Sequence, residues 1–377
     1  MRNIAVAILT LVSIAWAQER KVVHICVSLD EQHSAKVLAK FTEETGIEVV
    51  ARYDTEANKT VGLVQLLLGQ KESPQYDVYW NNELANTVKL KENGVLEAYR
   101  SAAAEGIPAA LKDPDGYWTG FAARARVLII NTDLVKPDEM PSSMWDLADP
   151  KWKGKVCMAR PRTGTTAAHA SALYTLDEAQ ADEYFRKLVD NDLVWLTGNA
   201  HCMREVSAGR FAFGWTDTDD FNVARLQGRP VAMVYPDKAD DQVGVMYIPN
   251  SLMLIKGGPN PDGGRALIDW LLRPEIEEML AHSATAQIPV RAGVKVPDHV
   301  RRPDQVGKTM TLDWDRVGRE YDKWVTRANA VIDKKGQEIA TAEGGGAGNV
   351  LLLVVIGVLI VGGLLLFVLK RATSEPT

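Results

Sequence analysis

A long apolar run near the C-terminus constrains this chain more than any other feature. Residues 350–369 are all apolar or glycine, and Lys370 and Arg371 follow at once. About 20 such residues are enough to cross a bilayer as one helix. The positive-inside rule places the two basic residues on the cytoplasmic side. We therefore expect a transmembrane helix over 350–369 that anchors the chain, unless this segment is a sorting signal that is later processed.

The N-terminus carries a second membrane-directed signal. Arg2 precedes an apolar stretch, residues 4–12, and Ala15-Trp16-Ala17 forms a small-x-small cleavage site. This pattern is typical of a secretory signal peptide, which we expect over residues 1–17. The exported part between the two signals has about 320 residues, which is long enough for two lobes rather than one small core.

Composition narrows the possible partners and cofactors. The net charge of −6 provides no basic surface for nucleic acid, and we expect a monomer without a nucleic-acid partner. Three cysteines, Cys26, Cys157 and Cys202, allow at most one disulfide in an oxidising compartment. Cys26 and Cys157 lie in apolar runs, which indicates small buried hydrophobes. No Cys-x-x-Cys or histidine spacing suggests a zinc site.

Short apolar runs alternate with helical patterns along the first hundred residues. We expect strands over 22–27, 47–53 and 77–80, and helices over 34–45, 60–68 and 84–93. This βαβαβα rhythm predicts a mostly parallel sheet with helices on both faces.

The same alternation continues to the end of the exported part. The expected strands are 127–131, 155–158, 211–215, 243–248 and 252–256, and the expected helices are 167–176, 179–190, a helix ending at 226, 263–272, 274–282 and 314–339. A Gly-rich linker, residues 342–349, precedes the apolar run.

Five segments, taken in order, resemble the bacterial periplasmic ferric-ion-binding proteins, which are solute receptors of ABC importers. They are Phe-Thr-Glu-Glu-Thr-Gly-Ile-Glu-Val (41–49), Tyr-Asp-Val-Tyr-Trp (76–80), Asp-Gly-Tyr-Trp-Thr-Gly-Phe (115–121), Ala-Arg-Val-Leu-Ile-Ile-Asn-Thr (125–132) and Asp-Pro-Lys-Trp-Lys-Gly-Lys-Val (149–156). The resemblance extends over residues 22–335. It implies an α/β periplasmic-binding-protein fold (type II) with two lobes, ligand capture by hinge closure, and docking on a membrane permease.

The resemblance also implies a division of the chain. Lobe one would comprise residues 21–123 and 250–320, lobe two residues 124–249, and a C-terminal helix residues 321–341. The two hinge crossover strands would lie near 124–131 and 246–254.

The loop of residues 163–166, Thr-Gly-Thr-Thr, is the first candidate ligand contact. It follows an expected strand and opens a helix of small residues, so free N–H groups and the helix dipole favour an anion there. The matching segment of the family binds a synergistic anion such as phosphate or carbonate. A plain threonine N-cap remains the alternative. Arg126 could pair the same anion or form a salt bridge at the hinge.

The acidic loop of residues 216–220 is the second candidate. The family places two adjacent, iron-binding tyrosines here, whereas this chain has Thr218 and Asp219 at about those positions. Aspartates suit Fe³⁺, Ca²⁺ or Mg²⁺, and they could instead hold an amine of an organic solute or cap the helix. The remaining tyrosines Tyr53, Tyr235 and Tyr247 fit core positions better than the site.

Two further loops complete the candidate site. Asp30 or His33 matches a family ligand position in the first loop, and Asn82 or Glu83 matches another after the third strand. All of these residues could equally cap helices or face solvent. The full set of candidate ligand-binding residues is Asp30, Asn82, Glu83, Arg126, Thr163, Gly164, Thr165, Thr166, Asp217, Thr218 and Asp219, with Asp217 and Asp219 as the candidate metal ligands.

These observations predict an extracytoplasmic solute-binding receptor of an ABC importer, not an enzyme. The ligand stays open between ferric iron or another hard cation with a synergistic anion and an anionic organic solute such as a phosphonate. Two alternatives remain. One is a metal-dependent hydrolase that uses Asp217, Asp219 and Asp220, and the other is a membrane-tethered sensor or scaffold.

Overall fold

The computed structural model describes residues 22–54 and 61–343 of the chain. The expected signal peptide (1–17) and transmembrane helix (350–369) lie outside the described residues, as does most of the Gly-rich linker. Within the described ranges, every helix is too short or too polar to cross a bilayer.

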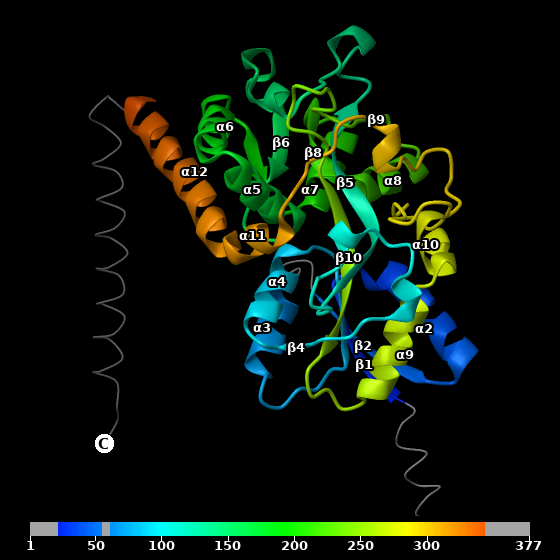
Figure 1. The fold of residues 1–377 in the computed structure, drawn as a ribbon. Helices are drawn as coiled ribbons and strands as arrows, with labels where there is room; N and C mark the ends of the chain where they lie inside the picture. The colour runs from blue at the N-terminus through cyan, green and yellow to red at the C-terminus, as the bar shows by residue number, and fades with distance from the viewer. Residues whose placement is uncertain (1–21, 55–60, 344–377) are drawn as a thin grey trace, which may run out of the picture.

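Two sets of parallel strands form the framework (Figure 1). In the first lobe, β1 (Val22–Val27) pairs in parallel with β2 (Glu48–Tyr53) and β3 (Val78–Asn81). In the second lobe, β6 (Val156–Ala159) pairs in parallel with β7 (Val194–Leu196) and β8 (Phe213–Asp217).

Two long, mutually antiparallel strands connect these sets, and each is antiparallel to the strand of the set with which it pairs. β5 (Thr119–Asn131) pairs with β10 (Tyr247–Ile255) up to Ala125 and with β8 from Arg126 onward. β10 also pairs with β3, which gives the strand order β2-β1-β3-β10-β5-β8-β6-β7. The sheet is therefore mixed. The expectation of a mostly parallel sheet holds within each set and is wrong for the strands between them.

Strand β10 also corrects the expectation of two separate strands at 243–248 and 252–256. The Pro-Asn-Ser sequence at 249–251 interrupts the apolar pattern, but the strand continues through it with a register shift between Pro249 and Asn250. The short strands β4 (Leu96–Glu97) and β9 (Val231–Val234) add to the edges of β10 and β5.

Helices cover both lobes (Figure 1). Those of the first lobe are α2 (Glu31–Thr45), α3 (Val61–Gly69), α4 (Ala85–Glu92), α9 (Pro261–Leu271) and α10 (Pro274–Ala281), and those of the second are α5 (Gly164–Leu176), α6 (Glu178–Asp190), α7 (Asn199–Ser207) and α8 (Thr218–Leu226). Each lobe has a core of its own. Phe41, Trp80 and Phe121 belong to the first core, and Trp152 and Phe213 to the second.

The C-terminal segment spans both lobes. The single helix expected over 314–339 is two helices, α11 (Trp314–Arg319) and α12 (Tyr321–Glu343), separated at Glu320. α11 lies so close to α4 that a Cβ on Gly318 would meet Val88 at 2.4 Å. α12 packs along α5 and α6 (Figure 1). Trp324 of α12 stacks on Tyr174 of α5, with ring centroids 5.1 Å apart.

Candidate functional site

A cavity of about 560 Å³ lies between the two lobes at the carboxyl ends of the parallel strands. Its lining includes Ser28 after β1, Asn82 after β3, Arg160 after β6, Thr197 after β7, and Asp217 at the end of β8. In open α/β sheets this edge is where loops lead into helix N-termini and where ligands bind. The same topology thus brings five strand ends from two lobes to one cavity.

Helix N-termini give the cavity an anion-binding wall. Gly164 begins α5 and Asn199 begins α7, and both line the cavity. Gly198 has no side chain with which to cap α7, and the Thr163 hydroxyl makes no cap hydrogen bond to the described residues of α5. The first-turn N–H groups and the positive ends of two helix dipoles are therefore directed at the cavity without a carboxylate of their own.

Asp217 organises the floor of the cavity. Its side chain is nearly buried, with 3% of its surface exposed. Oδ1 accepts a hydrogen bond from Arg126 Nη1 at 2.6 Å, and Oδ2 accepts one from Thr165 Oγ1 at 2.7 Å and one from Asn199 Nδ2 at 3.0 Å. Arg124 Nε lies 3.2 Å from the same Oδ2. One carboxylate thus holds two guanidinium groups and the first turns of α5 and α7 in place.

The charges of this cluster fix the ionisation of Asp217. Burial alone would raise the pKa of its carboxyl group. The guanidinium charges of Arg126 and Arg124, with the hydrogen bond from Thr165, outweigh burial and hold the pKa below its usual value. Burial would likewise lower the pKa of Arg124, but the carboxylates of Asp219 and Asp217 raise it above its usual value. Both groups stay charged at neutral pH.

Arg124 connects the two lobes at the cavity. It lines the cavity, its Nη2 donates to the backbone carbonyl of Asn82 at 2.7 Å, and its Nη1 lies 3.9 Å from Asp219 Oδ2. Asn82 in turn donates through Nδ2 to the Ser28 carbonyl at 3.2 Å. A single guanidinium therefore contacts the β3–α4 loop of the first lobe and the acidic loop of the second.

Arg126 lies behind the cavity rather than in it. It is fully buried, and its guanidinium carbon is 5.5 Å from the centroid of the Trp215 ring. The buried His169 packs on the same ring, with centroids 4.9 Å apart. Burial, with the charge of Arg126, holds the pKa of His169 well below its usual value. His169 is therefore neutral at neutral pH, and the positive charge at this place belongs to Arg126 alone.

Most of the candidate residues meet at this one cavity. Those that line it are Asp30, Asn82, Thr163, Gly164, Thr165, Thr166, Asp217 and Asp219. Three do not line it: Glu83, Arg126 and Thr218. The Tyr53, Tyr235 and Tyr247 side chains are also absent from the lining, and no other tyrosine of the described ranges contributes to it.

The three residues outside the lining have structural contacts that explain their positions. The Glu83 carboxylate accepts hydrogen bonds from the backbone N–H groups of Ala85 at 2.6 Å and Asn86 at 3.0 Å, and it therefore caps α4. Burial raises the pKa of Glu83. Thr218 Oγ1 accepts from the backbone N–H of Ala125 at 3.2 Å and so fixes α8 to β5. Glu83, Arg126 and Thr218 thus each contact a buried partner, and none of the three lines the cavity.

Arg124 and Asn199 also line the cavity, and neither stands out in the sequence as a site residue. Arg124 and Arg126 lie on the same face of β5, and the sequence alone does not show which of the two reaches the cavity. Asn199 follows β7, which has only three residues, so no clear apolar pattern marks the strand end before it. A Thr-Gly-Asn sequence at 197–199, after an apolar pair, is the signal that could have indicated a strand end and a helix start.

The acidic side chains form a compact group, with carboxylate oxygens of Asp217, Asp219 and Asp220 all within 4.8 Å of one another. Two of these carboxylates already have short contacts. Asp217 holds both arginines, and Asp220 Oδ2 accepts from Thr216 Oγ1 at 2.7 Å. The arginines neutralise much of the negative charge that a cation would need.

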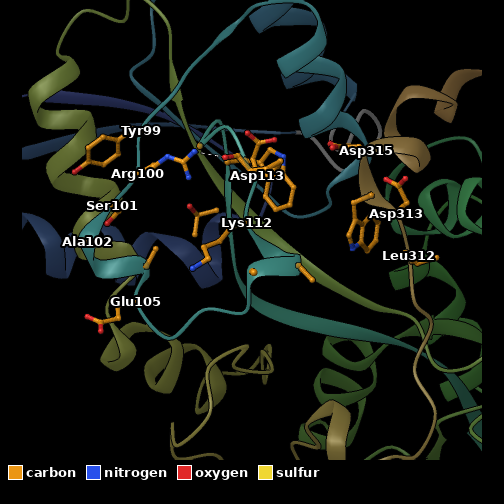
Figure 2. A pocket seen from close by; sticks show the side chains of 18 residues that line it. Tyr99, Arg100, Ser101, Ala102, Glu105, Lys112, Asp113, Leu312, Asp313 and Asp315 are labelled. Atoms are coloured by element: carbon orange, nitrogen blue, oxygen red, sulfur yellow. Dashed lines mark hydrogen bonds between the residues drawn. The ribbon is translucent and has the colours of Figure 1, made fainter.

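A larger cavity, of about 750 Å³, lies elsewhere, between residues of the first lobe and the segment before α11 (Figure 2). Tyr99, Arg100, Asp113 and Asp315 line it (Figure 2). Asp113 pairs with Lys91 and accepts from two backbone N–H groups, and Tyr99 donates to Asp269 at 2.8 Å. The contacts of Asp113 and Tyr99 stabilise the fold, and this cavity does not lie at the converging strand ends, so we place the functional site at the smaller cavity.

Known proteins resemble this chain over most of its length. Iron uptake protein A1 of Synechocystis is 28% identical over 299 residues, covering 75% of this chain and 79% of the relative. A putative 2-aminoethylphosphonate-binding periplasmic protein of Salmonella paratyphi A is 25% identical, covering 78% of this chain and 86% of the relative.

Solved structures share the fold. The periplasmic binding protein AfuA from Actinobacillus pleuropneumoniae, with exogenous fructose-6-phosphate bound, superposes with a TM-score of 0.74 at 21% identity, covering 83% of this chain and 99% of AfuA. This agreement confirms the two-lobe α/β periplasmic-binding-protein fold. The sequence profile of bacterial extracellular solute-binding proteins matches residues 36–306. The chain therefore belongs to the bacterial extracellular solute-binding protein family.

Proposed function

We propose that this protein is the extracytoplasmic receptor of an ABC importer and that it captures a small anionic solute in the cavity between its lobes. One observation carries the proposal: the uncapped N-termini of α5 and α7 and the buried guanidinium of Arg124 meet at that cavity. Main-chain N–H groups and a desolvated arginine together favour a phosphonate, phosphate or carboxylate group.

Negatively charged side chains also line the cavity, and they narrow the choice of ligand. Asp30 of the first lobe and Asp219 of the second also line it. A solute with an amine and an anionic group could contact both kinds of wall. We therefore take an aminoalkylphosphonate as the first ligand to test, and the Salmonella relative named for 2-aminoethylphosphonate supports this choice.

The connectivity supports closure of the two lobes about a hinge. We assign lobe one to residues 21–123 and 250–320 and lobe two to residues 124–249, with β5 and β10 as the hinge strands. A ligand that contacts both lobes stabilises the closed form, whereas one held equally by the open and closed forms would shift nothing. The closed form would then dock on a membrane permease, and the apolar segment 350–369 would keep the receptor near it.

Ferric iron is the second candidate, and two observations favour it. The three carboxylates of Asp217, Asp219 and Asp220 lie within 4.8 Å, and the relative from Synechocystis is an iron uptake protein. The paired arginines and the lack of a lining tyrosine among the described residues place it second. The family is one of solute-binding receptors, so the hydrolase alternative is not supported.

A thermal-shift panel tests the proposal. It includes 2-aminoethylphosphonate, inorganic phosphate, a hexose phosphate and ferric citrate. A specific ligand at a hundredfold its Kd adds about 2.7 kcal/mol of apparent stability. Stabilisation by the phosphonate, by inorganic phosphate or by the hexose phosphate supports the anionic solute. Stabilisation by ferric citrate alone favours the second candidate, and no response to any compound contradicts both.

A further inference from the structure

Two buried cysteines lie close to each other in the second lobe, in elements that also contribute residues to the lining of the ligand cavity. Cys157 is on β6 and Cys202 is in α7, and both side chains are fully buried. Their sulfur atoms are 3.4 Å apart. An approach of about 1.4 Å would bring them to the ~2.05 Å length of a disulfide bond. We propose that Cys157 and Cys202 are joined by a disulfide bond in the exported protein.

The neighbouring strand leaves room for this pair. Gly214 of β8 pairs with Cys157 across the sheet. A Cβ at Gly214 would lie 2.4 Å from Cys202 Sγ and 2.9 Å from Cys157 Sγ, closer than atoms approach without a bond. Any other residue at Gly214 would displace one sulfur from the other. Cys26 lies in the first lobe, on β1, and packs in a separate core cluster, so it is not a competing partner.

The oxidant comes from the compartment, so this inference rests on the extracytoplasmic location in the proposed function. Secreted and periplasmic proteins meet disulfide-bearing oxidant proteins during folding. Two thiols of the chain exchange with one disulfide of such an oxidant. The Cys157–Cys202 bond forms, the oxidant disulfide is reduced to two thiols, and the two electrons and two protons pass to it.

The burial of the two cysteines determines when the disulfide bond can form. Burial and the hydrogen bond with Cys202 raise the pKa of the Cys157 thiol well above its usual value, so the folded protein offers little thiolate to an oxidant. The bond therefore forms while the second lobe folds, before α7 covers β6. Once formed, it is shielded from small reductants by the same packing.

The bond would hold the cavity wall. Asn199, one turn before Cys202 in α7, donates to Thr165 Oγ1 at 2.7 Å and to Asp217 Oδ2 at 3.0 Å. A covalent link from α7 to β6 fixes the end of α7 that faces the ligand and so reduces the ordering that binding requires. We expect the reduced protein to have a lower Tm and a weaker affinity for the same ligand.

Thiol counting tests the proposal on the full chain, isolated from the extracytoplasmic fraction of its cells. The protein is denatured and alkylated with iodoacetamide, with or without prior reduction, and weighed by mass spectrometry. We expect one alkyl group without reduction and three after it. Cys26→Ala is the matched control, with none before reduction and two after. Cys202→Ala should carry two in both cases. Three alkyl groups on the unreduced extracytoplasmic protein overturn the proposal.

A second experiment tests the disulfide bond independently of the location of the protein in the cell. The reduced, denatured chain is refolded with oxidised glutathione and counted in the same way. If the bond forms on refolding but the cellular protein is found in the cytoplasm with three thiols, the location in the proposed function fails and the geometric inference stands. If the refolded chain keeps three thiols, the inference fails whatever the location.

Discussion

Arg126 and Asp217 form a buried ion pair, with Nη1 2.6 Å from Oδ1, at the point where β5 passes from the first lobe to the second. They face each other across the ladder between β5 and β8. The same carboxylate contacts Arg124, which lines the ligand cavity. The ion pair thus positions the cationic group on which the proposed anion site depends.

Replacing Asp217 by Asn should destabilise the protein strongly. The change leaves two buried guanidinium groups without their shared carboxylate, and breaking a buried pair by removing one partner costs about 3–5 kcal/mol. Urea unfolding measures the free energy of unfolding. Asp219→Asn is the matched control, with an expected cost of about 1 kcal/mol or less because its contact with Arg124 is longer, at 3.9 Å, and partly exposed. Equal losses in the two variants would contradict this role of Asp217.

Replacing Thr163 by Asp should have opposite effects on stability and on binding. An aspartate at this N-cap would occupy the free N–H groups of α5 and complement its dipole, raising the free energy of unfolding by about 0.5–1 kcal/mol. The same carboxylate would repel an anion at that helix end, so we expect at least a tenfold loss of affinity, or about 1.4 kcal/mol.

Thr163→Asn separates the two effects. It supplies a neutral cap, so it should stabilise α5 with a smaller loss of affinity. Chemical denaturation and calorimetric titration of both variants give the two quantities. An Asp variant that keeps the full affinity for the anionic solute would show that α5 does not contact it.

The stability of the protein should depend on pH through His169. The pKa of its ring lies well below its ordinary value of 6.5 in the folded state. As pH falls below 6.5, the unfolded chain takes up a proton that the folded protein does not, so the free energy of unfolding falls, by up to about 1.4 kcal/mol per pH unit. The His169→Phe variant keeps an aromatic ring packed on Trp215 but has no imidazole to take up this proton.

Unfolding curves at pH 7.5 and pH 5.5 measure the effect. The wild type should lose more stability between the two values than His169→Phe does. Parallel losses would mean that His169 is protonated in the folded protein, or that other groups account for the whole dependence.

Truncating Trp324 should show that α12 is part of the second lobe. Its ring stacks on Tyr174 of α5 at 5.1 Å, and its Nε1 donates to Glu320 at 2.8 Å. Trp324→Ala should cost about 3–5 kcal/mol, as large-to-small core changes do. Lys334→Ala, at an exposed position of the same helix, should cost less than about 0.5 kcal/mol. A small effect of Trp324→Ala on thermal unfolding would indicate a detached helix.

The sequence predicts the framework of this fold because the strongest patterns are local. β1 and α6 match their expected ranges to within a residue, since apolar alternation or a clear helical face marks each. β7 and α7 are not apparent in the sequence because β7 has only three residues, which is too few to show an apolar alternation. The break at Glu320 lies two residues after Gly318, but a single Gly inside a helical pattern is not a certain stop signal.

The site is predictable in part because local sequence patterns mark the ends of its strands. Strand ends followed by Thr, Asn or Asp mark the cavity edge, and most such residues line it. Pairing between distant side chains is not encoded locally. Arg126 and Asp217 are 91 positions apart, and they meet because the register of β5 against β8 places them opposite each other. The inward turn of Glu83 likewise depends on how α4 packs.

The most direct measurement is calorimetric titration of 2-aminoethylphosphonate and inorganic phosphate into the wild-type protein and into Arg124→Gln. The account predicts saturable one-to-one binding of at least one of these anions to the wild type. It also predicts a loss of affinity of at least tenfold in the variant, because a charge-assisted hydrogen bond contributes about 1.5–3 kcal/mol. Equal affinities in the two proteins, or wild-type binding of ferric iron with no response to either anion, would contradict it.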